Sequence, residues 1–467
     1  MSNGLILLIF FGIMLTTLFL GTPVSMSLGF TGILGVIFWV GADKLTQFGV
    51  IAYTQATNAN QMILPMFIMM SEFLARGGIA EDIFSVINRG IGKFKGGLAI
   101  ATTLSCTIFA ALCGSSPATA ASIGKISIEA MTKRGYSPAF AVGTVAAGGT
   151  LGIMIPPSIT FCIYATLTEN SVVQLFMAGI IPGLMLSALI IISIIVRCRL
   201  NPSLINYGRE NAAIAPEMTI AEAKEILNEA KDQVLAEKEF SAGIEEDKIQ
   251  AEGPTFFTII PSFALIAVVL GSMYFGIATP VEAAGYGVIG AFLITLFQRR
   301  MTKSMFRSVL WATARTGSMM VFMIICGITM TFVVSYLGIP QDIAKVIVSS
   351  GLNRYVVLFL IYVLWFILGA LMDPSSMVLL TIPFLYPTLI TLDFDPLWFG
   401  VTCVLAAQIA MITPPIGLNL FVLRANTDIP MNTIIMGSLP YVGILLFGLL
   451  LITLFPGLAT WLPSMMY

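Results

Sequence analysis

Histidine is absent from this chain, and charged residues fill only 10% of its 467 positions. The missing histidine removes the commonest metal ligand and general base. The six cysteines form no C-x-x-C pair, so the sequence indicates neither a disulfide framework nor a metal cluster. We therefore expect no enzyme activity, no organic cofactor and no nucleic-acid partner.

Low charge also excludes an ordinary water-soluble protein, because soluble domains carry roughly 25% charged residues. Hydrophobic residues make up 57% of the chain. They recur in runs of about 20, the length that one helical crossing of a bilayer needs. The short alternating segments of an outer-membrane barrel do not occur. The sequence predicts an all-α polytopic protein in a lipid bilayer.

The first half of the chain recurs in the second half at an offset of about 258 residues. Chance matches would scatter, whereas these motifs keep one order. We expect two copies of one unit, residues 1–198 and 255–467. An acidic cytoplasmic linker over 199–254 joins them, with a short amphipathic helix over 219–234. The matching motifs are Thr22-Pro23-Val24 with Thr279-Pro280-Val281, Gly78-Ile79 with Gly338-Ile339, Pro156-Pro157 with Pro414-Pro415, and Gly179-x-x-Pro182 with Gly437-x-x-Pro440.

Each half is predicted to contain a re-entrant hairpin followed by a discontinuous helix. Residues 97–113 and 117–130 are each too short to span comfortably, and Gly114-Ser115-Ser116-Pro117 separates them. Irregular backbone at membrane depth is tolerated only beside protein or a cavity. The hairpins are expected over 97–130 and 353–392, and the broken helices over 138–168 and 396–424. The segments expected in the first half are 4–20, 24–40, 50–75, 79–95, 97–130, 138–168 and 173–197.

A re-entrant hairpin returns to its own side, so each half crosses the membrane an odd number of times and the second copy must be inverted. The distribution of Lys and Arg tests this expectation. With the N-terminus outside, only Lys44, Lys345 and Arg354 fall outside, and every other base beyond the linker faces the cytoplasm. We therefore expect two inverted-topology repeats, with both termini outside and the linker inside.

Inverted repeats with paired interrupted helices indicate a secondary transporter with its sites near the midplane. Proline frees backbone carbonyl groups, which with hydroxyl oxygens suit Na⁺, and opposing helix N-termini attract anions. The offset places Thr150 on Gln408 and Ser115 on Asp373. The predicted sodium ligands are Gly114, Ser115, Ser116 and Thr119 with Gly149 and Gly152, and Asp373 and Ser376 with Thr413 and Pro414. The predicted substrate-binding residues are Ser116, Thr150, Pro156, Gln408 and Asn419.

Plainer interpretations of these residues stay open. Ser115, Ser116 and Thr119 could make the interhelical hydrogen bonds that are common in membrane bundles. Asp373, an acid at membrane depth, indicates a functional site by default. It could equally cap the second hairpin by accepting backbone N–H groups.

These motifs resemble the large membrane subunit of tripartite ATP-independent periplasmic (TRAP) transporters over nearly the whole chain. The resemblance is strongest at Gly-Ser-Ser-x-Ala-Thr (114–119), Lys-Arg-Gly-Tyr (133–136), Leu-Gly-Ile-x-Ile-Pro-Pro-Ser (151–158), Ala-Gly-Ile-Ile-Pro-Gly (178–183), Ala-Thr-Pro-x-Glu-Ala-Ala (278–284) and Thr-Pro-Pro-x-Gly-Leu-Asn-Leu-Phe (413–421).

The resemblance implies sodium-driven symport of an organic acid, a carboxylate or a sialic-acid-like anion, across a bacterial inner membrane. It also implies a small four-helix membrane subunit, expected as a separate chain, and a periplasmic substrate-binding protein. Both termini would then be periplasmic, and the hairpins and broken helices would move together as an elevator. Cys113 stands where the family usually has Ser, which puts one sodium ligand in doubt.

Three rival functions remain for the sequence. A stand-alone sodium/carboxylate symporter or an ion antiporter would use similar hairpins and would need no binding protein. A membrane enzyme is disfavoured because there is one plausible mid-membrane Asp, no His, and no Lys placed at membrane depth as a base. A channel fits two inverted halves around one midplane site less well than alternating access does.

Overall fold

A computed structural model describes residues 3–206, 256–349, 351–414 and 417–466 of the chain. These residues form helices, and no strand occurs among them. The amphipathic helix expected over 219–234, with most of the acidic linker, lies outside the described residues.

The first half follows the expected order of elements, with hairpin α6–α7 and broken helix α8–α9. The last helix extends two residues beyond the expected end of the repeat, to Leu200. The elements are α1 (Asn3–Phe19), α2 (Val24–Gly35), η1 (Val36–Val40), η2 (Ala42–Leu45), α3 (Thr46–Thr57), η3 (Ala59–Met62), α4 (Ile63–Arg76), α5 (Ile79–Ile91), α6 (Gly97–Cys113), α7 (Ser116–Lys133), α8 (Pro138–Thr150), η4 (Leu151–Ile153), α9 (Ile159–Thr168) and α10 (Val172–Leu200).

The second half repeats this order, with hairpin α17–α18 and broken helix α19–α20, and ends in a short helix that the sequence did not predict. Its elements are α13 (Phe256–Tyr274), α14 (Pro280–Phe297), α15 (Lys303–Tyr336), α16 (Ile339–Ser349), α17 (Arg354–Gly369), α18 (Pro374–Thr391), α19 (Pro396–Ala410), α20 (Leu418–Asn426), α21 (Met431–Leu454) and α22 (Gly457–Ser464).

The long third span expected over 50–75 is wrong, because the chain breaks there into α3 and α4. Asn58 leaves the helical conformation with ψ at 116°, and its side chain accepts a hydrogen bond from the Asn60 N–H. Asparagine competes for nearby backbone groups in this way and favours helix ends. The counterpart in the second half, α15, is one continuous helix of 34 residues.

Six described helices are long and apolar enough to cross a membrane, or seven if the bent pair Ala59–Arg76 and Ile79–Ile91 counts as one span. One of them, α18, differs from the rest because 72% of its apolar window is buried, against 28–50% in the others. It therefore faces protein over most of its length. The six are α10, α13, α14, α15, α18 and α21.

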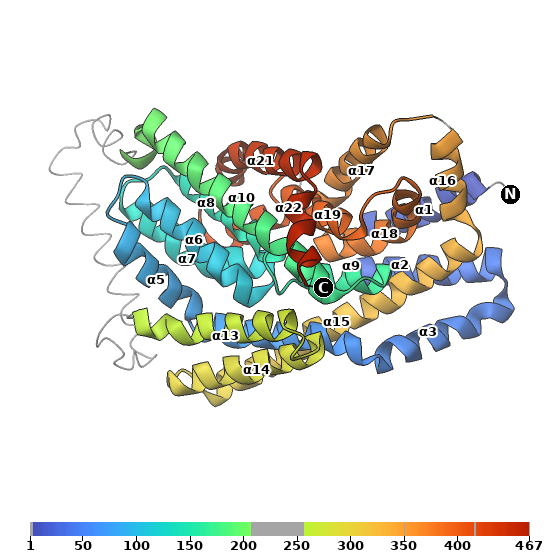
Figure 1. Cartoon of the computed structure of the whole chain (residues 1–467), viewed down its shortest axis with the longest axis horizontal. Coiled ribbons are helices and arrows are strands. Elements are labelled where there is room, and N and C mark those ends of the chain that lie inside the picture. The colour runs from blue at the N-terminus through green and yellow to red at the C-terminus, as the bar shows by residue number, and fades with distance from the viewer. Residues whose placement is uncertain (1–2, 207–255, 350, 415–416, 467) are drawn as a thin grey trace.

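Helices at corresponding positions of the two halves make corresponding contacts with the opposite half. Helix α2 packs on α15 as α4 packs on α14, α7 packs on α20 as α18 packs on α9, and α8 packs on α21 as α19 packs on α10. Figure 1 shows α5, α6 and α7 toward one end of the long axis, and α16, α17 and the N-terminal end toward the other. The two hairpins therefore enter the molecule from opposite ends.

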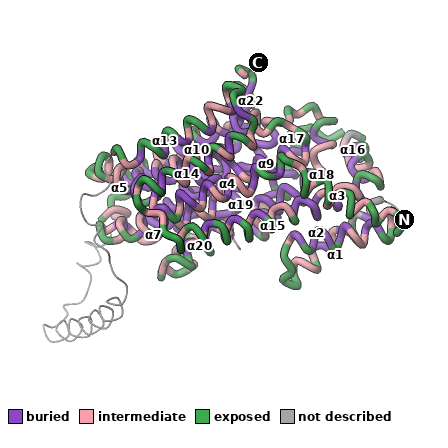
Figure 2. The backbone as a smooth tube through the Cα atoms, turned by 90° about the horizontal axis from the view of Figure 1, so that it is seen from below, coloured by how far each residue is buried: buried purple, intermediate pink, exposed green. Residues whose placement is uncertain are grey.

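The core runs through the centre of the molecule, where α4 and α19 are largely buried (Figure 2). Glycine allows the closest approach between halves, where α8 meets α21. A Cβ on Gly143 would lie 2.0 Å from the Gly437 carbonyl oxygen, and a Cβ on Gly437 would lie 2.0 Å from that of Ala139. Small residues at such contacts allow membrane helices to associate by backbone packing.

Candidate functional site

The first hairpin turns at Gly114 and packs directly against the break in the helix that follows it. Gly114 has φ of +64°, the left-handed conformation that glycine adopts most easily at a helix end. A Cβ there would lie 2.4 Å from the Pro157 carbonyl oxygen, and a Cβ on Gly152 would lie 2.6 Å from that of Ser115. Both glycines are therefore required by the close approach of tip and break.

The first broken helix ends at Thr150 and restarts at Ile159. The Ser158 hydroxyl donates to the Ile153 carbonyl at 2.6 Å and accepts from the Phe161 N–H, so one side chain joins both sides of the break. Pro156 is buried in the loop between them, and the Pro156–Pro157 peptide bond is cis. Because Pro157 has no N–H to donate, the helix cannot continue through this position.

Asp373 caps the second hairpin arm. Its carboxylate accepts a hydrogen bond from the Ser376 N–H at 3.1 Å and another from the Ser376 hydroxyl. Aspartate is among the preferred residues at this position. This is the capping role that the sequence left open for Asp373. The Ser376 hydroxyl also contacts Met323 Sδ of α15 at 3.7 Å, a contact for which the sequence carries no signal.

The second broken helix ends at Ala410 and restarts at Leu418. Thr413 donates its hydroxyl to the Ile409 carbonyl at 2.7 Å, and the Asn419 N–H reaches back across the break to the Met411 carbonyl at 3.1 Å. Thr413 and Pro414 are half-buried. Gly369, at the end of the second hairpin's first arm, packs on Ala410, with a Cβ on that glycine 2.6 Å from the Ala410 Cβ.

Two hydrogen bonds join the halves at these breaks. Gln408 Nε2 donates to Thr150 Oγ1 at 2.8 Å, and Asn419 Nδ2 donates to Ser116 Oγ at 2.8 Å. All four side chains have 0% exposure. Apart from Pro156, the predicted substrate-binding residues thus form two hydrogen-bonded pairs, each with one residue from either half of the chain.

Each pair leaves an amide oxygen buried with no hydrogen-bond partner among the described residues: Gln408 Oε1 and Asn419 Oδ1. The Thr150 hydroxyl donates to the Ala147 carbonyl at 2.6 Å, so it can only accept from Gln408, which places the NH₂ group toward Thr150 and the oxygen away from it. A buried acceptor without a partner costs about 1–3 kcal/mol. A bound cation or hydrogen-bond donor would remove that cost.

The surroundings supply neutral oxygens and few charges. In the described part of the chain, no group of three or more Cys, Asp or Glu side chains could hold a metal ion. Hydroxyl, amide and carbonyl oxygens are hard ligands that suit an alkali cation. Cys113 is buried beside Gly114.

Eight of the ten predicted sodium ligands lie at the two hairpin tips or packed against the first one, whereas Thr413 and Pro414 lie in the second break. Around the first tip, Gly152 lies against the Ser115 carbonyl and the Thr119 hydroxyl, and Gly149 lies against Ala120. Asp373 and Ser376 contact each other at the second tip. Ser158 was missed as a site residue, although a serine after two prolines and before an apolar run is a helix N-cap pattern.

Helix ends of both polarities meet in this region. α7 and α20 begin at the Ser116–Asn419 hydrogen bond, and α9 begins beside the first tip. α8 and α19 end at the Thr150–Gln408 bond. Helix N-termini attract anions and C-termini attract cations. The arrangement can therefore hold opposite charges close together.

Residues 11–458 match the family described as the tripartite ATP-independent periplasmic transporter, DctM component. The chain belongs to this family. It is a multi-pass membrane protein of the TRAP transporter class, and the TRAP resemblance of its motifs is confirmed. The family is one of transporter subunits, which agrees with the expectation that the chain is not an enzyme.

This DctM-family chain is similar to curated relatives over their whole length. It is 31% identical to the C4-dicarboxylate TRAP transporter large permease protein DctM of Vibrio cholerae, covering 100% of this chain and 98% of that protein. It is 32% identical to the protein of the same name in Pseudomonas aeruginosa, covering 94% of each.

Among solved structures, the YdaH transporter of Alcanivorax borkumensis matches with a TM-score of 0.59 at 13% identity, covering 90% of this chain and 89% of that one. At this identity the likeness concerns the fold alone. The fold of the DctM-family chain is thus similar to that of a solved transporter.

Proposed function

We propose that this chain is the large membrane subunit of a TRAP transporter that imports a small organic anion by symport with Na⁺. The proposal rests on two buried hydrogen-bonded pairs, Thr150 with Gln408 and Ser116 with Asn419. They bring together polar side chains from equivalent breaks in both halves, where alternating-access transporters have their sites. The relatives named for C4-dicarboxylates favour a dicarboxylate among the possible carboxylates.

The substrate carboxylate would bind where α7 and α20 begin, near Ser116 and Asn419. Both helices present N–H groups and a positive dipole end there. Thr150, Gln408 and Pro156 would line the other side. The binding therefore needs no buried basic side chain.

Sodium would use the oxygen atoms that the breaks expose. One site would combine the tip from Gly114 to Thr119 with backbone carbonyls around Gly149 and Gly152. A second would combine Asp373 and Ser376 with Thr413 and the carbonyl of Pro414. The unpartnered Gln408 Oε1 fits a cation and would add to this set.

The two repeats would lie inverted, and the hairpins with the broken helices would move as one body against α1–α4 and α13–α15. The exchanged packing contacts and the entry of the hairpins from opposite ends of the long axis support this arrangement. The burial of α18 supports a re-entrant arm over a lipid-facing span. Sodium and substrate would be coupled because both favour the same closed conformation.

TRAP transporters are tripartite, which supports two partners for this chain, a small membrane subunit and a periplasmic substrate-binding protein. The membrane would be the bacterial inner membrane. Both termini would be periplasmic, and the distribution of Lys and Arg along the sequence supports this orientation.

Uptake into proteoliposomes that contain the chain and its small subunit tests the proposal, with binding protein and succinate outside. We expect accumulation with an inward Na⁺ gradient and none when K⁺ replaces Na⁺. Equal uptake in the two salts would reject the coupling. Uptake without any binding protein would favour the stand-alone symporter, and single-channel currents would favour a channel.

A further inference from the structure

A hollow of about 610 Å³ lies between the middle of α7 and the C-terminal end of α20, two helices that begin at the candidate substrate site. It is separate from the breaks themselves, and most of its lining is polar. The lining residues are Lys125, Arg424, Ala425, Asn426, Thr427 and Asp428.

The helices α7 and α20 connect this hollow to the Ser116–Asn419 bond. They begin together at that bond and still pack against each other further along, where a Cβ on Gly124 would lie 3.0 Å from Leu423 Cδ2. At 1.5 Å per residue, Lys125 lies about 14 Å along α7 from Ser116, and Arg424 about 8 Å along α20 from Asn419. Helices α7 and α20 therefore extend from the buried Ser116–Asn419 hydrogen bond to the exposed basic side chains of Lys125 and Arg424.

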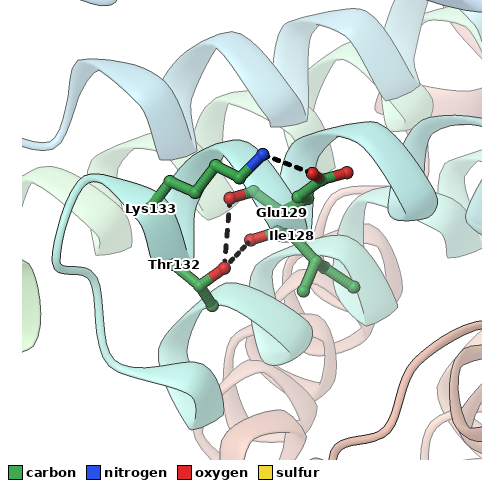
Figure 3. A network of polar contacts seen from close by, with 4 residues as sticks. All are labelled: Ile128, Glu129, Thr132 and Lys133. Atoms are coloured by element: carbon green, nitrogen blue, oxygen red, sulfur yellow. Dashed lines mark hydrogen bonds and ion pairs between the residues drawn. The ribbon is translucent and has the colours of Figure 1, made fainter. Parts of the chain in front are cut away.

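Two cations face this hollow, and Asp428 is the one acid in its lining. Arg424 Nη1 donates to the Thr427 carbonyl at 3.2 Å and to the Ile429 carbonyl at 3.4 Å, which holds the guanidinium at the rim without cancelling its charge. The ion pairs found in the described ranges include neither Lys125 nor Arg424. Glu129, one helical turn beyond Lys125, pairs with Lys133 instead at 2.5 Å (Figure 3).

We propose that this hollow is a second, weaker subsite for the transported carboxylate, which it occupies between the buried site and the aqueous face. The inference rests on the proposed function, because it takes the same ligand class. Lys125 and Arg424 attract the carboxylate, and Asp428 keeps the attraction weak enough for release. Exposed charges in water bind weakly and reversibly, as an exit step requires.

Thiol labelling measures the charge of the hollow without any transport. Ala425→Cys places an exposed thiol in the lining, and the six native cysteines are buried, so the unsubstituted chain serves as the blank. The probes are an anionic and a cationic methanethiosulfonate of similar size. We expect the anionic reagent to react faster, by on the order of tenfold. Adding Lys125→Gln and Arg424→Gln should remove that preference.

Lys133→Gln with Arg134→Gln is the matched control, because it removes the same formal charge at the C-terminal end of α7, outside the lining of the hollow. Lys133 is engaged by Glu129 (Figure 3). Arg134 donates to the Gly92 carbonyl at 3.2 Å, and neither residue lines the hollow. The preference should survive in this control. Succinate should protect the thiol more than KCl does at equal ionic strength.

Equal reaction with both reagents, an equal loss in the control, or no protection by succinate beyond that of KCl overturns the proposal. Because labelling needs no ion gradient, these results stay separate from the sodium dependence of uptake. A chain whose uptake ignored Na⁺ could still pass the labelling test, and a sodium-coupled chain could fail it.

Discussion

Gln408 donates a hydrogen bond to Thr150 across the centre of the molecule, although 258 residues separate the two in the chain. This separation equals the offset at which motifs of the first half recur in the second half. Each residue stands at the last turn of a helix that ends at a break. The bond therefore joins the ends of the two interrupted helices.

Removing either partner of this bond should have a non-additive effect. Thr150→Val leaves the Gln408 amide without its acceptor, and Gln408→Leu removes the donor. Each should destabilise the protein by about 1–3 kcal/mol, with a coupling of about 1 kcal/mol in the double variant. Thermal unfolding of the purified complex in detergent measures all three variants. Fully additive effects would mean that the contact contributes nothing.

Gly152→Ala should disrupt the first hairpin tip. A Cβ there would lie 2.6 Å from the Ser115 carbonyl oxygen and 2.8 Å from Thr119 Oγ1. Overpacking of this kind costs about 1–3 kcal/mol, and moving the tip should raise the Na⁺ concentration for half-maximal uptake several-fold. Gly443→Ala is the control, because a Cβ at that site meets nothing within 4 Å. Similar sodium dependence in both variants would contradict a role for this contact.

Asp373→Asn separates the two roles of Asp373. Asparagine still accepts from the Ser376 N–H, so stability should change by less than about 0.5 kcal/mol. If the charge also binds Na⁺, the Na⁺ concentration for half-maximal uptake should rise about tenfold, equivalent to about 1.4 kcal/mol. Asp373→Ala should lose the cap as well, at about 1 kcal/mol. Unchanged sodium dependence in the asparagine variant would leave Asp373 as a helix cap alone.

The two connecting helices α5 and α16 should differ in how firmly they are anchored. Arg300 Nη2 donates to Asp82 Oδ1 at 2.9 Å, and Arg300 Nη1 donates to the Gly77 carbonyl at 2.6 Å. The Asp82 side chain is only 5% exposed. Arg300→Met should therefore cost about 3–5 kcal/mol, because it leaves a buried carboxylate without its partner.

The comparison is the Lys345–Asp342 pair of α16, whose atoms lie 3.7 Å apart with side chains 79% and 46% exposed. Lys345→Met should cost less than about 1 kcal/mol. Chemical denaturation with Asp82→Asn added to Arg300→Met measures how much of the loss comes from the unpaired charge. Equal costs for Arg300→Met and Lys345→Met would contradict the asymmetry.

Several features of the fold could be predicted because they depend on local chemistry. The turn at Gly114, the breaks at Pro156 and Pro414, and the helix starting at Pro374 follow from residues that restrict φ or remove an N–H donor. The break at Asn58 was missed because a single asparagine disfavours a helix interior only weakly. Its ψ of 116° and the hydrogen bond that its side chain accepts from the Asn60 N–H show that the helix ends there.

The sequence predicted which residues belong to the candidate site better than it predicted which of them contact one another. The offset of the repeat placed Thr150 and Gln408 at equivalent positions, and their contact follows from a packing that the offset alone does not specify. Asn419 was predicted as a site residue within the 413–421 motif. An interhelical hydrogen bond of Ser116 was an open interpretation, but Asn419 was not predicted as its donor. The contact of Met323 with Ser376 carries no sequence signal, because methionine packs wherever space allows.

The sequence by itself determined the membrane class and the positions of the interrupted helices, since hydrophobicity and Gly–Pro breaks act over short stretches of chain. The tertiary structure alone decided which oxygens are left without partners, which helix ends meet, and that α7 and α20 lead to a basic hollow. These features depend on how distant helices pack, and packing is a property of the whole molecule.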